Sequence, residues 1–359
     1  MRYKLKKIIM ILTDEMLMAA FRYRDTKLWE RLDDSMIFAF RLSDGETGYC
    51  CVMGNAGEHL ALGFFRGEKG FTSYLKSLMA NGLPENDMIE FMYSYECLNC
   101  DFMNSNTANE LDKEAKARIR EFAKANGLKI RRPNGWPDFT CHSKYKMPHG
   151  IVDKRDAQDI TEALNAAIAL ANRINSDEDL LELGFDPMRN YASYKGGKTI
   201  PMLIPNSDGT YEWSTTKTPA FIKEDYPKPT YDNQIASTQI KALKHNGTFQ
   251  CRAIHGPGIV EGDDGIPYMP TMMLFVLEEN TFAFPVLSDM AVEEDPMSIL
   301  HNLASVILEN DFCPKTLKVK DELTYNLLAD FCKKTGIKLL KVDEIHVFDM
   351  AWNFMRMMM

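Results

Sequence analysis

The stretch from Met36 to Met79 constrains the fold more than any other part of the chain, because its local signals agree with one another. Two apolar runs, MIFAFRL and GYCCVM, flank a turn in which Asp44-Gly45 supplies the positive φ angles of a tight hairpin. Residues 59–65 form a third apolar run, and apolar side chains at helical spacing follow it over residues 71–79. The sequence therefore predicts three antiparallel strands and then a helix.

Helices and strands alternate around this stretch in the first half of the chain. We expect a helix over 14–32, a strand over 88–95, a helix over 107–126, a strand over 128–132 and a helix over 153–174. The fold class that this order predicts is α/β (α+β) with a mixed sheet.

The second half repeats much of this order after a change in composition. Residues 175–246 are rich in Pro, Gly, Tyr and Lys, which favours a domain connection that carries a hairpin over 199–215 and a short helix over 235–243. We expect strands over 249–254, 271–277 and 282–287, a helix over 295–309, a strand over 316–320, a helix over 322–335 and a strand over 337–342. This predicts two domains, 1–174 and 247–359.

The two domains are interpreted as related by an internal duplication. The segments KARIREFAKANGLKI and YNLLADFCKKTGIKL both read as a helix, a glycine stop and a strand. The alternative is that such a corner is common and arises independently. Each domain is expected to have three antiparallel strands followed by alternating helices and strands, and a ribonuclease H-like strand order is a further hypothesis for each.

Composition and charge limit the compartment and the partners. A chain of 359 residues with 45% apolar and 26% charged residues suits a folded two-domain protein, and a net charge of −9 disfavours nucleic acid as a partner. The basic start MRYKLKKIIMIL has too short an apolar run for a signal sequence, and no run approaches the roughly 18 residues of a membrane helix. Eight scattered cysteines favour reduced thiols in the cytoplasm.

Three segments of the chain, residues 28–71, 127–151 and 314–339, resemble a family of uncharacterised bacterial proteins. They read LWERLDDSMIFAFRLSDGETGYCCVMGNAGEHLALGFFRGEKGF, GLKIRRPNGWPDFTCHSKYKMPHGI and PKTLKVKDELTYNLLADFCKKTGIKL. Members of this family consist of two consecutive domains of unknown function. The resemblance implies a cytoplasmic two-domain protein, and it carries no activity or catalytic residues.

Cysteines at positions 97 and 100 form the motif that most suggests a metal. Two thiolates at the spacing of Cys97 and Cys100 can share one zinc ion, and Cys141, His142 or His149 could complete the ligand set. Against zinc, the chain has no second pair of this kind, and thiols at a strand end are often only buried.

Four acidic residues form the second hypothetical site. In a ribonuclease H-like domain, Asp44, Glu96, Asp153 and Asp156 would hold magnesium at the ends of strands and at the start of a helix. The alternative makes Asp44 a turn residue and Asp153 a helix cap.

The aromatic residues outside the expected helices and strands suggest a ligand site. One cavity would be lined by two segments, which are Trp136 with His142 and Lys144, and the hairpin with Tyr211 and Trp213. The alternative is that these aromatic residues only cover the edge of a core. We therefore favour a non-catalytic binding or interaction protein with a cleft between the domains, no predicted cofactor, and a protein or small-molecule partner. A metal-dependent phosphodiester hydrolase is the alternative.

Overall fold

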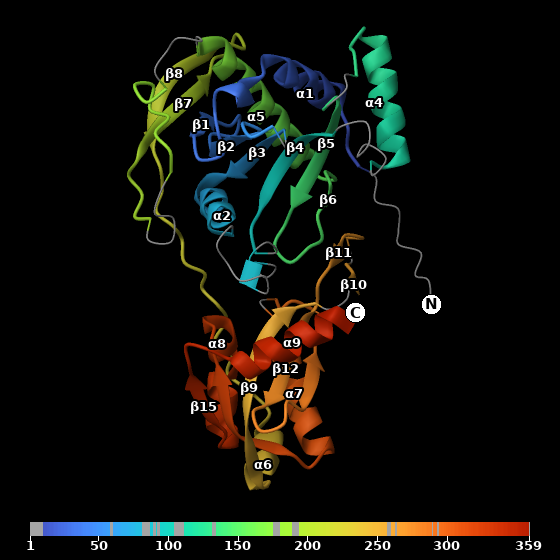
Figure 1. Ribbon diagram of the computed structural model, residues 1–359, viewed down its shortest axis with the longest axis vertical. Helices are drawn as coiled ribbons and strands as arrows, with labels where there is room; N and C mark the ends of the chain where they lie inside the picture. The colour runs from blue at the N-terminus through green and yellow to red at the C-terminus, as the bar shows by residue number, and fades with distance from the viewer. Residues whose placement is uncertain are drawn as a thin grey trace. The chain divides into compact units, whose positions relative to one another are not determined.

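The chain divides into two compact units, each with its own sheet. The computed structural model describes residues 10–57, 60–80, 87–88, 91, 94–103, 111–130, 134–174, 180–188, 194–256, 260–262, 264–288, 290–292 and 294–358 (Figure 1). The first unit comprises Met1–Leu83 and Phe91–Ile222, and the second comprises Pro84–Glu90 and Lys223–Met359.

An eight-stranded sheet runs through the described part of the first unit. Its strands are β1 (Ile37–Arg41), β2 (Thr47–Met53), β3 (Ala61–Arg66), β4 (Cys97–Met103), β5 (Trp136–His142), β6 (His149–Gly150), β7 (Thr199–Pro205) and β8 (Tyr211–Lys217). They lie in the order β6-β5-β4-β3-β2-β1-β7-β8. All neighbouring strands are antiparallel except β1 and β7, which are parallel.

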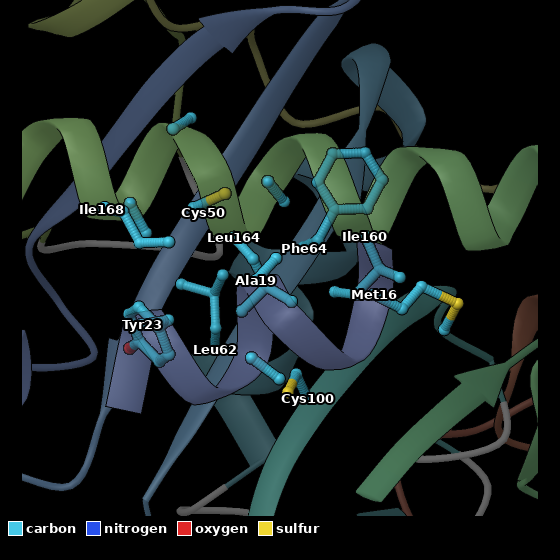
Figure 2. Close-up of a cluster of buried hydrophobic side chains, with 14 of the residues drawn as sticks. Met16, Ala19, Tyr23, Cys50, Leu62, Phe64, Cys100, Ile160, Leu164 and Ile168 are labelled. Atoms are coloured by element: carbon cyan, nitrogen blue, oxygen red, sulfur yellow. The ribbon is translucent and has the colours of Figure 1, made fainter. Parts of the chain in front are cut away.

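Helices cover both faces of this sheet. They are α1 (Asp14–Thr26), the 3-10 helix η1 (Leu28–Glu30), α2 (Gly67–Ala80), α4 (Lys113–Ala125) and α5 (Lys154–Arg173). Figure 2 shows the core on the face of α1 and α5, where Met16 and Tyr23 of α1 meet Ile160 and Leu164 of α5 over Leu62 of β3. The helix α2 packs against the opposite face through Phe71, Tyr74 and Leu75.

The caps expected at Thr13, Asp153 and Gly127 are present, but α1 ends at Thr26 and not at residue 32, and α4 begins at Lys113 behind the cap residue Asp112 and not at residue 107. The Thr13 hydroxyl accepts a hydrogen bond from the Met16 amide at 3.1 Å, and the Asp153 carboxylate accepts one from the Arg155 amide at 2.7 Å. The helix α4 ends at Ala125, and the φ of +65° at Gly127 lets the Leu128 amide donate to the Ala123 carbonyl at 2.8 Å.

A five-stranded sheet forms the centre of the second unit as described. Its strands are β9 (His245–His255), β12 (Thr271–Leu277), β13 (Ala283–Leu287), β14 (Cys313–Val319) and β15 (Lys338–Lys341), in the order β13-β12-β9-β14-β15. The helices are α6 (Gln234–Ala242), α7 (Pro296–Glu309) and α8 (Glu322–Thr335) on one face and α9 (His346–Met358) on the other. A separate pair consists of β10 (Val260–Glu261) and β11 (Pro267–Tyr268).

The α/β class, the mixed sheets and the two sheet-containing regions are confirmed. The two halves do not share one strand order, so the ribonuclease H-like order that was a hypothesis for each is not confirmed. The fourth strand of the first unit, β4, is antiparallel to β3, whereas β14 of the second unit is parallel to β9. The two sheets differ because β7 already occupies the outer edge of β1 in the first unit.

Two expected strands are replaced by others. Asp87, Met88 and Phe91 are helical, so the fourth strand starts only at Cys97, and residues 89–90 and 92–93 lie outside the described part. Residues 128–130 are irregular, and the remaining two positions of that expected strand are not described. The fifth strand is β5, which sequence reasoning treated as a loop because of its flanking Gly135 and internal Pro137.

The expected connection over 175–246 is also corrected. Its hairpin, β7 and β8, belongs to the first sheet, because β7 pairs with β1 through Ala39–Met202 and Phe40–Leu203. The first unit therefore extends to Ile222. The helix α9 at the end of the chain was not expected from the sequence.

Candidate functional site

A pocket of about 560 Å³ lies at one end of the first sheet. Strands β3 and β5 end there, β4 begins there, and the first turns of α2 and α5 complete the wall. The charged lining residues are Glu46, Arg66, Glu68, Lys69, Glu96, Asp156 and Asp159. Antiparallel pairing brings these segments to one edge although they are far apart in sequence.

The direct passage from β3 into α2 positions the cationic centre of the pocket. Arg66 is the last residue of β3, and α2 starts at Gly67 with no loop between them. Gly67 has a φ of +60°, in the left-handed region that glycine adopts without strain. A Cβ at Gly70 would lie 2.7 Å from the Phe65 carbonyl carbon, so the absence of a side chain allows α2 to approach β3 closely.

Arg66 is surrounded by three carboxylates. Its guanidinium forms ion pairs with Asp44 and Asp159, and its Nε donates to Glu46 at 2.8 Å. Burial opposes the charge on Arg66, but the hydrogen bond and negative charge of Asp159 raise the pKa of Arg66 above its usual value. Arg155 adds a second cation at 2.9 Å from Asp44. Arg66 is therefore neutralised and offers little positive charge to a ligand.

Asp156 is less exposed than Glu96, and within the described residues no Lys or Arg forms an ion pair with it, although the nearby His149 opposes the effects that raise its pKa. Burial raises the pKa of Asp156, and the negative charges of Asp153 and Asp159 raise it further. The Cys141 thiol lies 3.9 Å from the Asp156 carboxylate. Burial also raises the pKa of Cys141, to about 11, so this thiol stays protonated at neutral pH.

His142 forms part of the wall on the face of α2. It pairs across the strands with Cys97 and stacks on Tyr95 with 5.5 Å between ring centroids. Burial lowers the pKa of His142, which keeps the imidazole neutral at neutral pH. The site thus combines a neutral imidazole and protonated thiols with a concentration of carboxylates.

Comparison with known families assigns both halves of the chain. Residues 14–186 match the family described as Domain of unknown function (DUF7309), and residues 235–356 match Domain of unknown function (DUF6930). The chain carries two consecutive domains of unknown function. A comparison with curated proteins gives no match. Within the described residues, no helix is both long and apolar enough to cross a membrane.

All the described lining residues of the pocket except Ile222 lie within the DUF7309 match, and of the four acidic residues expected to hold magnesium the pocket includes Glu96 and Asp156. Asp153 caps α5, and Asp44 accepts from the Glu46 amide at 3.0 Å in the hairpin turn, as the alternative interpretation predicts. The Glu46 amide is the first cause that lowers the pKa of Asp44, and Arg66 and Arg155 contribute to it. Asp44 is thus held by cations of the chain itself.

The CxxC pair cannot chelate one ion in this fold. Cys97 and Cys100 are three positions apart on β4, so their side chains lie on opposite faces of the sheet. Cys97 packs with the α2 face, whereas Cys100 and Cys141 pack with α1 and α5. Across the described ranges, no three Asp, Glu, His or Cys side chains are grouped as a metal ion requires.

The two aromatic segments do not face one cavity. Trp136 lies on β5 and Trp213 on β8, and five strands lie between these two in the sheet. Trp136 packs under the cations of Lys116 and Arg120, with 5.4 and 5.2 Å to the ring centroid. The proposed joint site is therefore dropped.

His142 lines the pocket described above, whereas Tyr211 and Trp213 line a different one. Lys144 lies in the turn after β5 and is not among the lining residues.

Sequence reasoning missed the residues that dominate the electrostatics of the pocket. Arg66, Glu68, Lys69 and Asp159 were not considered, although Arg66 ends a buried strand and Glu68 follows immediately at the start of a helix. Asp159 is only 8% exposed in its side chain. A buried acid on the apolar face of a helix was the available signal, since such acids are almost always paired.

Proposed function

We propose that the chain is a non-catalytic binding protein, and that the pocket of its DUF7309 domain binds a small ligand carrying an amine or guanidinium group. The observation that carries this proposal is the charge of the lining, in which carboxylates outnumber lysine and arginine side chains by five to two among the described residues. Arg66 is paired with Glu46 and Asp159 of the same lining, so the charges outside this ion-pair group are Glu68, Glu96 and Asp156 against Lys69. A ligand cation would supply the missing counter-charge.

Asp156 is the residue best placed to recognise that cation. Its pKa is raised first by burial and then by Asp153 and Asp159, so ionisation is unfavourable in the empty pocket. A bound cation would favour the carboxylate, and a charge-assisted hydrogen bond contributes roughly 1.5–3 kcal/mol. Binding should therefore weaken as the pH falls and Asp156 becomes protonated.

The chemical state of the pocket supports binding over catalysis. A nucleophilic cysteine needs a thiolate at neutral pH, but burial raises the pKa values of both Cys97 and Cys141. A two-metal hydrolase needs several free carboxylates, and Asp44 is paired with Arg66 and Arg155. The hydrolase remains the alternative function, to be tested beside the first.

A cytoplasmic location is part of the proposal. All eight cysteines are unpaired and buried, which suits a reducing compartment. The partner we infer is a small molecule held in the DUF7309 domain, and the net charge of −9 argues against nucleic acid.

A thermal-shift titration tests the proposal. Spermidine, agmatine and n-butylamine are the cationic probes, and 1-butanol and butyrate are the neutral and anionic comparisons. We expect stabilisation by at least one cationic probe, and an affinity at least about tenfold lower in Asp156→Asn, which corresponds to about 1.4 kcal/mol. Without ligand, Asp156→Asn should melt at a higher temperature near pH 8, because it removes a partly buried charge and its repulsion from Asp153 and Asp159.

The matched control is Glu121→Gln on the exposed face of α4, which should leave both results unchanged. Failure of every cationic probe, or equal binding by wild type, Asp156→Asn and Glu96→Gln, would contradict the proposal. Stabilisation by Mg²⁺ or Mn²⁺ that is lost in Asp44→Asn would favour the hydrolase instead.

A further inference from the structure

A second pocket, of about 690 Å³, lies on the α1 and α5 side of the first sheet near its β8 edge. Asn165, Asn172 and Arg173 of α5 form one wall, and Tyr211 and Trp213 of β8 form the opposite wall. Arg22 of α1 and the turn at Gly209 and Thr210 also line it, and its apolar lining residues are Ile168, Ala169 and Leu203. We call this groove the Trp213 groove. It shares no lining residue with the pocket of about 560 Å³ described above, which we call the Asp156 pocket.

The charge of the Trp213 groove is opposite to that of the chain as a whole. Among the described residues that line it, Arg22 and Arg173 are charged and none is a carboxylate, although the chain carries a net charge of −9. Within the described part of the chain, no carboxylate pairs with Arg22. The nearby acid Glu162 already accepts hydrogen bonds from the Ser43 amide and from Gln158, each at 2.9 Å. The groove therefore favours an anion.

Trp213 supplies a rigid aromatic surface in the same groove. The Arg173 guanidinium lies 5.7 Å from the centroid of its ring, and the buried Phe185 contacts it with 6.5 Å between centroids. An indole held in this way can stack on a planar ring, while guanidinium groups bind phosphate through paired hydrogen bonds. The side-chain amides of Asn165 and Asn172 offer both donors and acceptors to the edge of such a ring.

We propose that the Trp213 groove binds a nucleoside monophosphate, with the base stacked against Trp213 and the phosphate held by Arg22 and Arg173. This class of molecule combines the planar, hydrogen-bonding ring and the anion that the lining matches. A cavity of about 690 Å³ is within the range of small-molecule sites. The inference concerns a different pocket from the proposed amine site and does not depend on it.

The test is a titration of the full chain with adenosine 5′-monophosphate, by calorimetry and by NMR of the tryptophan indole N–H groups. Adenosine lacks the anion, ribose 5-phosphate lacks the base, and inorganic phosphate lacks both base and sugar. We expect the monophosphate to bind at least about tenfold more tightly than each of the three and to bind more weakly at high salt. Trp213→Phe removes one of the four tryptophan signals and so assigns the one that should shift.

Arg22→Gln should weaken binding of the monophosphate at least about tenfold while preserving the melting temperature, because Arg22 is exposed. The control Lys217→Gln changes an exposed cation on the same strand as Trp213, outside the groove, and should have no effect. The proposal is overturned by absence of monophosphate binding at millimolar concentration, or by equal binding of inorganic phosphate. An unshifted Trp213 signal, or full affinity in Arg22→Gln, would also overturn it.

Discussion

At the scale of single residues, the structure places one acid, Asp138, where its ionisation is unfavourable. Asp138 of β5 lies directly across from Asp101 of β4 and is partly buried. Burial and the charge of Asp101 raise the pKa of Asp138 to about 6, from a usual value of 3.8. The folded state therefore holds this proton more tightly than the unfolded state. The stabilisation by this proton is lost as the pH rises from about 4 through about 6.

Asp138→Asn should accordingly stabilise the first unit at neutral and alkaline pH. We expect the free energy of unfolding to rise by about 1–2 kcal/mol at pH 8, allowing for partial exposure of the carboxyl group. The gain should shrink steadily between pH 7 and pH 4. Urea denaturation at several pH values measures it, and a gain that does not vary with pH would point to packing instead of charge.

At the scale of elements, the junction of β3 and α2 determines the shape of the Asp156 pocket. Alanine usually stabilises a helix interior relative to glycine by about 1 kcal/mol. At Gly70 we expect the opposite, because the new Cβ would lie 2.7 Å from the backbone of Phe65. Gly70→Ala should lower the free energy of unfolding by about 1–3 kcal/mol in a urea titration.

The neighbouring substitution Lys69→Ala is the control for this helix. Lys69 is exposed, so its loss should change stability by less than about 0.5 kcal/mol. A gain in stability from Gly70→Ala would mean that α2 can move away from β3 without cost.

At the scale of the whole molecule, each unit buries a core of its own. In the second unit, Tyr231 packs against Phe331 with 4.9 Å between ring centroids, and Ile240 of α6 is fully buried in the same core. Both residues precede Gly247, where the sequence predicts that the second domain starts. We expect a fragment of residues 223–359 to unfold in one cooperative transition, and a fragment of residues 247–359 not to do so.

Near-ultraviolet circular dichroism and urea titration distinguish these two fragments. The longer fragment lacks Asp87, whose carboxylate pairs with Arg252 at 2.7 Å, so Asp87→Asn in the full chain is the control for the loss of that pair. Cooperative unfolding of the shorter fragment would show that Tyr231 and α6 are not required for this core.

The sequence by itself determined what depends on neighbouring residues, and the tertiary structure decided what depends on which surfaces meet. The hairpin turn at Gly45, the caps at Thr13 and Asp153 and the stop at Gly336 were predictable, because each rests on the conformation of a few adjacent residues. Strand pairing instead depends on which edges are free. Since β7 occupies the edge of β1, the first sheet could not be deduced from the order of its strands. The pocket is likewise a product of that pairing, which brings Arg66, Cys141 and Asp156 together from separate segments.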